Sequence, residues 1–138
     1  MRRKILLDTS FFHVYFSGLN EEVKKAVEEV YTGKGIGYTL DLNLAEFLYT
    51  YGKLKGIEEA NVRLSLILNS PIKIVSTNKE LALRAGELKV KHQNLSIVNC
   101  FLVVFAEKEN AEIYTTNSEI GKVYKNTIIL HRGEISRV

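Results

Sequence analysis

The stretch Ile5-Leu6-Leu7-Asp8-Thr9-Ser10 is a short apolar run that ends in an aspartate, and it predicts the first strand of a sheet. Similar short apolar runs recur along the chain, with helical patterns between them. Strands separated by helices form parallel sheets, because a parallel crossover needs about a dozen residues. The sequence therefore predicts an α/β fold with helices on both faces of a parallel sheet. Its expected strands are 5–7, 36–40, 72–75, 112–115 and 127–130.

The helices between these strands are predicted from apolar periodicity and from capping residues. Asn20 precedes a stripe of apolar residues that begins at Val23 and recurs at helical spacing. Asp41 is expected to be the N-cap of the next helix, in which Glu46 lies beside the buried stripe. The further helices are predicted over about 58–68, from the capping box Thr77-Asn78-Lys79-Glu80 to about 91, over 96–106 after the cap Ser96, and over 118–124.

Composition limits the class of protein. The chain has 138 residues, 46% hydrophobic and 25% charged, with a net charge of +3, which fits one domain over 1–138. No apolar run approaches the roughly 18–20 residues of a membrane helix, and the N-terminus lacks a signal-peptide core, so we expect a cytoplasmic protein without a membrane partner. A lone Cys100 excludes an intrachain disulfide and a multi-cysteine zinc site.

Polar residues stand at positions where a parallel sheet binds ligands. Asp8 follows the first predicted strand and Asn117 follows the fourth, and ligands bind outside the carboxyl ends of such strands. Glu46 is early enough in its helix to point back over that edge. Asn99 is the only polar residue in the run 97–106, where an unpartnered amide would cost roughly 1–3 kcal/mol. Each of these residues also has a simpler interpretation. Asp8 and Asn117 could each be only a cap or part of a turn, Glu46 could be a solvated helix residue, and Asn99 could be a core or interface asparagine with its hydrogen bonds satisfied.

Four segments, taken together and in order, resemble the PIN domain family, especially the small VapC-type toxins. The resemblance implies a three-layer α/β/α fold and an acidic pocket that binds Mg²⁺ or Mn²⁺ and hydrolyses RNA. It places Asp8 and Glu46 at two acidic positions of the family. It also implies a homodimer and an antitoxin-like partner. The segments are Ile5-Leu6-Leu7-Asp8-Thr9-Ser10, Asn43-Leu44-Ala45-Glu46-Phe47-Leu48, Leu95-Ser96-Ile97-Val98-Asn99-Cys100-Phe101 and Tyr114-Thr115-Thr116-Asn117.

The chain departs from this family at two positions, because Asn99 and Asn117 stand where the family usually has aspartate. Amides can offer neutral oxygens or orient water, but they cannot balance the charge of two adjacent dications. We therefore expect Asp8 and Glu46, with help from the two asparagines, to bind at most one Mg²⁺ or Mn²⁺, and weakly. Glu119 or Asp41 could compensate, although a first-turn helix carboxylate and an N-cap are the simpler interpretations.

Two functions follow as hypotheses. The first is a metal-dependent endoribonuclease of the VapC type with a weakened metal site. The second is a catalytically inactive PIN scaffold that binds RNA or a protein partner. The sequence leaves open whether the two asparagines are natural or engineered.

Local groups of basic residues have two possible interpretations. They are either solvated helix faces or phosphate contacts around the cleft. The groups are Lys24-Lys25, Lys53-Lys55, Lys89-Lys91-His92 and Lys122-Lys125.

Overall fold

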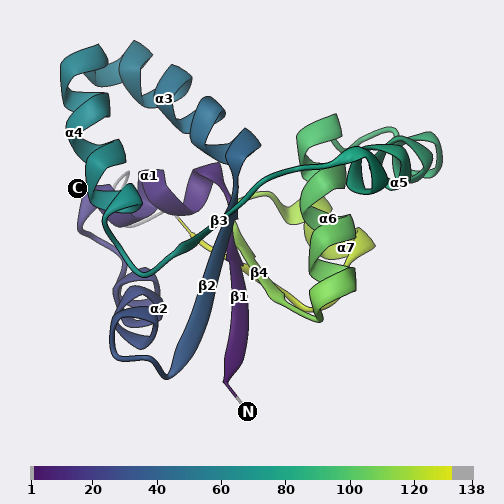
Figure 1. Ribbon diagram of the computed structural model, residues 1–138, viewed down its shortest axis with the longest axis horizontal. Helices are drawn as coiled ribbons and strands as arrows, with labels where there is room; N and C mark the ends of the chain where they lie inside the picture. Colours follow the sequence, from purple (N-terminus) through teal and green to yellow (C-terminus); the bar gives the residue numbers. More distant parts are fainter. Residues whose placement is uncertain (1, 132–138) are drawn as a thin grey trace.

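Five parallel strands form the centre of the computed structural model, which describes residues 2–131 (Figure 1). Their order is β3-β2-β1-β4-β5, so the chain builds outward from β1 to one side and then crosses to the other. The point between β1 and β4 is where an open parallel sheet opens a crevice at its carboxyl edge. All five predicted strands are confirmed. They are β1 (Arg3–Leu7), β2 (Gly35–Leu40), β3 (Lys73–Val75), β4 (Glu112–Thr115) and β5 (Thr127–Ile129).

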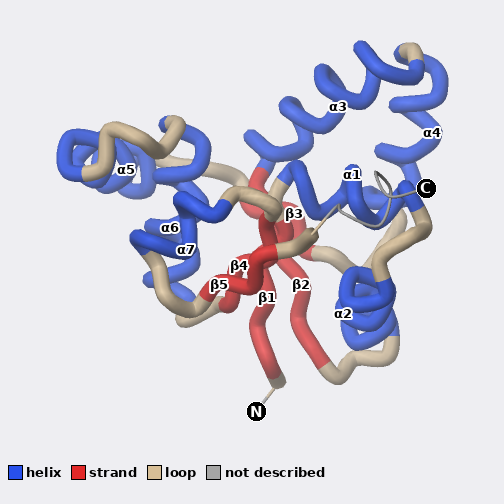
Figure 2. Tube along the Cα trace, turned by 180° about the vertical axis from the view of Figure 1, so that it is seen from behind, coloured by secondary structure: helices blue, strands red, loops and turns tan. Residues whose placement is uncertain are grey.

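Helices cover both faces of the sheet, which confirms the predicted three-layer α/β/α fold. Figure 2 shows α1 and α2 on one side of the strands and α5, α6 and α7 on the other, with α3 and α4 rising beyond the sheet as a pair. The bounds are α1 (Thr9–Ser17), α2 (Glu21–Tyr31), α3 (Asp41–Lys55), α4 (Ile57–Leu68), α5 (Lys79–Lys91), α6 (Ile97–Glu109) and α7 (Ser118–Val123). In the described part of the chain, none of these helices combines the length and the apolar character that a membrane span requires.

The central strand β1 contributes side chains to two separate hydrophobic cores, because successive side chains of a strand point to opposite faces of the sheet. Ile5 and Leu7 pack with α1, α2 and α3 on one face, whereas Leu6 packs with α5 and α6 on the other. All three side chains are fully buried. The apolar run that opens the sequence is therefore apolar throughout because both of its faces are covered.

Three local features differ from what the sequence predicted. The N-cap of α5 is Asn78, which accepts a hydrogen bond from Leu81 N at 2.9 Å, so Thr77 does not cap this helix as the capping box predicted. The helix α1 was not predicted, although Asp8 caps it by accepting a hydrogen bond from Phe11 N at 2.9 Å. Asp41 is not the N-cap of α3, since Leu40 occupies that position. The Asp41 carboxylate instead accepts a hydrogen bond from Thr77 N at 3.2 Å, a contact between segments far apart in the sequence.

Candidate active site

A polar pocket of about 410 Å³ lies at the carboxyl edge of the sheet. This is the edge opposite the N-terminus in Figure 1. The structure brings all four sequence-predicted residues to it, including Asn99, whose helix follows another helix in the chain. The lining residues are Asp8, Thr9, Ser10, His13, Asn43, Glu46, Thr50, Leu54, Asn99, Thr116 and Asn117.

Asp8 is held rigidly at the floor of this pocket and is only 5% exposed. Its Oδ1 accepts hydrogen bonds from Ser10 Oγ at 2.6 Å and from Phe11 N at 2.9 Å. Its Oδ2 accepts one from Thr115 Oγ1 at 2.5 Å. Burial raises the pKa of Asp8 above its ordinary value, and the negative charge of Glu46 raises it further. The three hydrogen bonds lower that pKa without cancelling the effect of burial.

The same hydroxyls tie the turn after β4 to the start of α1. Thr115 Oγ1 accepts a hydrogen bond from Asn117 N at 3.0 Å, and Ser10 Oγ accepts one from Thr116 N at 2.9 Å. Asn117 Oδ1 caps α7 by accepting from Glu119 N at 2.9 Å. One carbonyl lone pair of Asn117 therefore already serves the helix, and the second is what the side chain can offer to a ligand.

Glu46 is positioned by a second group of polar residues on α1 and α3. Thr9 Oγ1 donates to Glu46 Oε1 at 2.8 Å. Asn43, which is buried, donates from Nδ2 to the same threonine hydroxyl at 3.2 Å. Sequence reasoning did not identify Asn43 as a pocket residue. The available signal was its place one helical turn before Glu46, where side chains share a face.

His13 and Thr50 form the outer wall beside Glu46. His13 Nε2 lies 2.7 Å from Thr50 Oγ1, and this hydroxyl donates to the backbone oxygen of Glu46 at 2.8 Å. The imidazole ring also packs against Phe47 and Tyr51, with ring centroids 5.5 and 5.6 Å apart. His13 therefore combines packing against aromatic rings with a place in the pocket wall.

The two other acids considered for this site lie outside the pocket. Asp41 bonds to Thr77, as described above, and does not line the cavity. Glu119 pairs with Lys122 at 2.9 Å and lines a different cavity. The carboxylates of the polar pocket are therefore those of Asp8 and Glu46.

The donor set fits one hard divalent cation. Within residues 2–131 there is no group of three or more His, Cys, Asp or Glu side chains that could hold a metal. The four sequence-predicted residues are two carboxylates and two amides, and all of them present oxygen, the ligand atom that Mg²⁺ and Mn²⁺ prefer. Mg²⁺ is commonly held by one or two carboxylates with water completing the shell. Two carboxylates do not neutralise a pair of dications.

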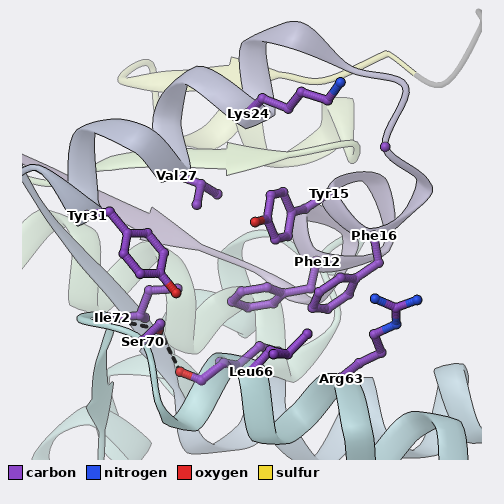
Figure 3. A pocket seen from close by; sticks show the side chains of 12 residues that line it. Phe12, Tyr15, Phe16, Lys24, Val27, Tyr31, Arg63, Leu66, Ser70 and Ile72 are labelled. Carbon is purple, nitrogen blue, oxygen red and sulfur yellow. Dashed lines mark hydrogen bonds between the residues drawn. The ribbon is translucent and has the colours of Figure 1, made fainter.

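A second cavity, of about 470 Å³, is larger but chemically different (Figure 3). It lies between α1, α2 and α4 and is walled mainly by aromatic and aliphatic side chains. Figure 3 shows Phe12, Tyr15 and Phe16 on its wall, with Arg63 next to the ring of Phe16. Its lining contains no carboxylate, so it cannot supply the acids that a metal site or a proton transfer needs. The smaller polar pocket is the candidate active site.

Comparisons with known proteins find several solved structures with a similar fold. No curated protein matches the chain. A DNA-bound VapBC structure from Salmonella typhimurium has a TM-score of 0.73 at 12% identity, covering 93% of this chain and 97% of that one. VapBC2 of Rickettsia felis, bound to a promoter DNA fragment, has a TM-score of 0.72 at 19% identity, with 92% and 97% covered. VapC20 of Mycobacterium tuberculosis, described as a sarcin-ricin loop cleaving toxin, has a TM-score of 0.68 at 16% identity, with 86% and 94% covered.

At these identities the likeness of structures concerns the fold. The family itself is shown by a sequence model, the PIN domain, which matches residues 5–126. That span begins at β1, contains the whole polar pocket and ends just before β5. The chain belongs to the PIN domain family.

Proposed function

We propose that this protein is a metal-dependent endoribonuclease of the VapC type, working with a weakened, single-ion metal site. One observation carries the proposal. In a PIN-family chain, Asp8, Glu46, Asn99 and Asn117 come from four separate segments and line one pocket at the carboxyl edge of the sheet. We assign metal binding to these four residues and RNA as the substrate.

The chemistry divides between the ion and the protein. A bound Mg²⁺ or Mn²⁺ would polarise the scissile phosphate and lower the pKa of the attacking water. Asp8 and Glu46 would be the anionic ligands of this ion, and their carboxylates can accept a proton from the water, whereas an amide cannot act as a general base. Asn99 and Asn117 orient water or phosphate by donating from their NH₂ groups and accepting at their carbonyl oxygens. Ser10 and Thr115 keep the Asp8 carboxylate in one orientation.

The second candidate function is a PIN scaffold without catalysis that binds RNA or a protein. The observation in its favour is the reduced acid content of the pocket, with two carboxylates where the family usually has four. An antitoxin-like protein is the partner we propose in either case, since several similar structures are toxin–antitoxin or VapBC complexes. A homodimer, a single domain over 1–138 and a cytoplasmic location stay predictions from the sequence.

The deciding experiment is cleavage of a structured RNA pool with and without Mn²⁺. Asp8→Ala removes a proposed metal ligand, and Glu28→Ala removes an exposed acid of α2 that lines none of the cavities, as the matched control. The proposal expects Mn²⁺-dependent cleavage by the wild type and by Glu28→Ala, and none by Asp8→Ala. A folded wild-type protein that cleaves nothing at any Mn²⁺ concentration would contradict the nuclease and favour the scaffold function.

A further inference from the structure

A third cavity, of about 380 Å³, lies between the loop that joins α5 to α6 and the helix α7. None of the residues that line the active-site pocket lines this cavity. Its lining is predominantly polar and basic, unlike the apolar cavity of Figure 3. The lining residues are Val90, Lys91, His92, Gln93, Asn94, Leu95, Glu119, Lys122 and Val123.

The cavity joins two basic segments that are far apart in the sequence. Lys91 and His92 come from the end of α5, and Lys122 comes from α7. Glu119 is the only acid on this lining, and it pairs with Lys122 at 2.9 Å. The Lys122 side chain is 70% exposed, and an ion pair of this kind contributes little, so Lys122 can turn to another anion at small cost.

The loop that forms one wall is held in a fixed shape. Lys89 Nζ donates to Gln93 O at 2.7 Å and to Leu95 O at 2.6 Å. Leu95 is buried, and its backbone N donates to His92 O at 3.1 Å. Lys89 is therefore a positioning residue for the loop, whereas the amide side chains of Gln93 and Asn94 add donors to the wall.

This basic cavity adjoins the active-site pocket through two segments, the start of α7 and the residues that lead into α6. Asn117 lines the pocket and Glu119 lines the cavity, and two residues span at most about 7 Å of chain. On the other side, Leu95 lines the cavity and Asn99 lines the pocket, four residues further on, at most about 14 Å away along the chain. A single RNA strand that enters the pocket can therefore continue over the cavity.

We propose that this cavity is a subsite for the phosphate backbone of the RNA strand, beside the scissile phosphate. Lys91, Lys122 and the imidazole N–H of His92 contact phosphate oxygens there. Such contacts fix the register of the strand without reading its sequence. The identity of the ligand rests on the proposed function. The subsite nevertheless has a separate consequence for the salt dependence of RNA binding, because each phosphate that a lysine neutralises releases counterions.

The test is the salt dependence of RNA binding, measured by fluorescence anisotropy in EDTA so that no cleavage occurs. The probe is a labelled single-stranded RNA of about 12 nucleotides. The variant is Lys91→Gln with Lys122→Gln. The matched control is Lys25→Gln with Lys34→Gln, which removes the same charge from exposed positions on α2 and on the turn before β2, outside all three cavities.

For single strands each lost phosphate contact reduces the slope of log K against log salt by about 0.7, so the double variant should lose about 1.4. Between 50 and 200 mM salt the wild type would then lose about sevenfold more affinity than the variant, while the control keeps the wild-type slope. Equal slopes for variant and wild type would overturn the proposal. It would also be overturned if a polyglutamate peptide displaced the labelled RNA from the wild type as well as unlabelled RNA does. If the wild type cleaves no RNA in the Mn²⁺ experiment but the double variant shows a reduced salt slope, the nuclease is rejected and the subsite is retained. If the wild type cleaves RNA but the double variant keeps the wild-type slope, the nuclease is retained and the subsite is rejected.

Discussion

Replacing Thr115 with valine tests how the protein holds its buried carboxylate. Thr115 is fully buried, and valine has nearly the same shape, so the change removes a hydroxyl without opening a cavity. That hydroxyl donates to Asp8 Oδ2 at 2.5 Å and accepts from Asn117 N at 3.0 Å. The substitution therefore weakens the support of Asp8 and leaves one backbone N–H of the pocket rim without its acceptor.

The expected loss follows from these two contacts. A hydrogen bond to a charged group contributes about 1.5–3 kcal/mol, and an N–H left without an acceptor costs about 1–3 kcal/mol where water cannot reach it. Since Asn117 is only half-buried, we expect about 2–4 kcal/mol of lost unfolding free energy at pH 7.

The loss should depend on pH, and its sign is fixed by the pKa of Asp8. Burial raises that pKa in the folded protein, so the charged carboxylate destabilises the fold at pH values above its ordinary value near 3.8. Thr115 opposes this effect by stabilising the charged form, and its removal raises the pKa further. The destabilisation by Thr115→Val should therefore be largest near neutral pH and shrink as pH falls through the pKa of Asp8.

Thr39→Val is the matched control. Thr39 is also fully buried beside β1, but its hydroxyl donates at 2.7 Å to the neutral backbone oxygen of Leu7. Its loss should cost about 1 kcal/mol at every pH. The assay is urea unfolding of both variants in EDTA, between pH 7 and about pH 4. A Thr115→Val effect that matches the control in size and is independent of pH would refute the reasoning.

Three further predictions concern the metal site and the packing of the sheet. Asp8→Asn should raise the unfolding midpoint of the metal-free protein at neutral pH, by removing the buried charge, and the gain should disappear below about pH 4 in a thermal scan. Asn99→Asp with Asn117→Asp should tighten Mn²⁺ binding about tenfold or more in calorimetry, because added carboxylates increase the charge of the ligand set. An unchanged affinity would show that positions 99 and 117 do not belong to the metal site. Gly37→Ala would place Cβ 2.9 Å from a methyl carbon of a buried valine and should cost about 1–3 kcal/mol in urea unfolding, whereas Gly86→Ala, with nothing within 4 Å, should stabilise α5 by about 0.5–1 kcal/mol.

The strands and most helices could be predicted because their signals are local. The caps Asn20 and Ser96 accept hydrogen bonds from residues three positions on, as such caps do in any context. The missing helix α1 shows the limit. Phe11, Phe12 and Val14 are all buried, so the segment is apolar on most of its surface and gives no amphipathic stripe. The order of the strands depends on pairing between distant segments, which no local pattern specifies.

The residues of the candidate site also differ in whether a local sequence pattern could predict them. Asp8 and Asn117 could be placed at the carboxyl edge because Asp8 directly follows β1 and Asn117 comes two residues after the end of β4. Asn43 was missed because its main contact, to Thr9, joins residues 34 positions apart. Asp41 was misassigned for a similar reason, since a contact with Thr77, 36 positions away, replaced the expected local cap. The catalytic roles of the four pocket residues stay predictions.

The most direct test of the central claim is the rate of RNA cleavage measured across a Mn²⁺ titration, with Glu46→Gln in parallel. One ion held by two carboxylates predicts a hyperbolic rise that saturates only at high Mn²⁺, and Glu46→Gln should shift that curve to still higher concentrations or abolish it. A sigmoidal curve that requires two ions, or cleavage that is independent of Mn²⁺ and of Glu46, would contradict a one-ion nuclease site built from Asp8, Glu46, Asn99 and Asn117.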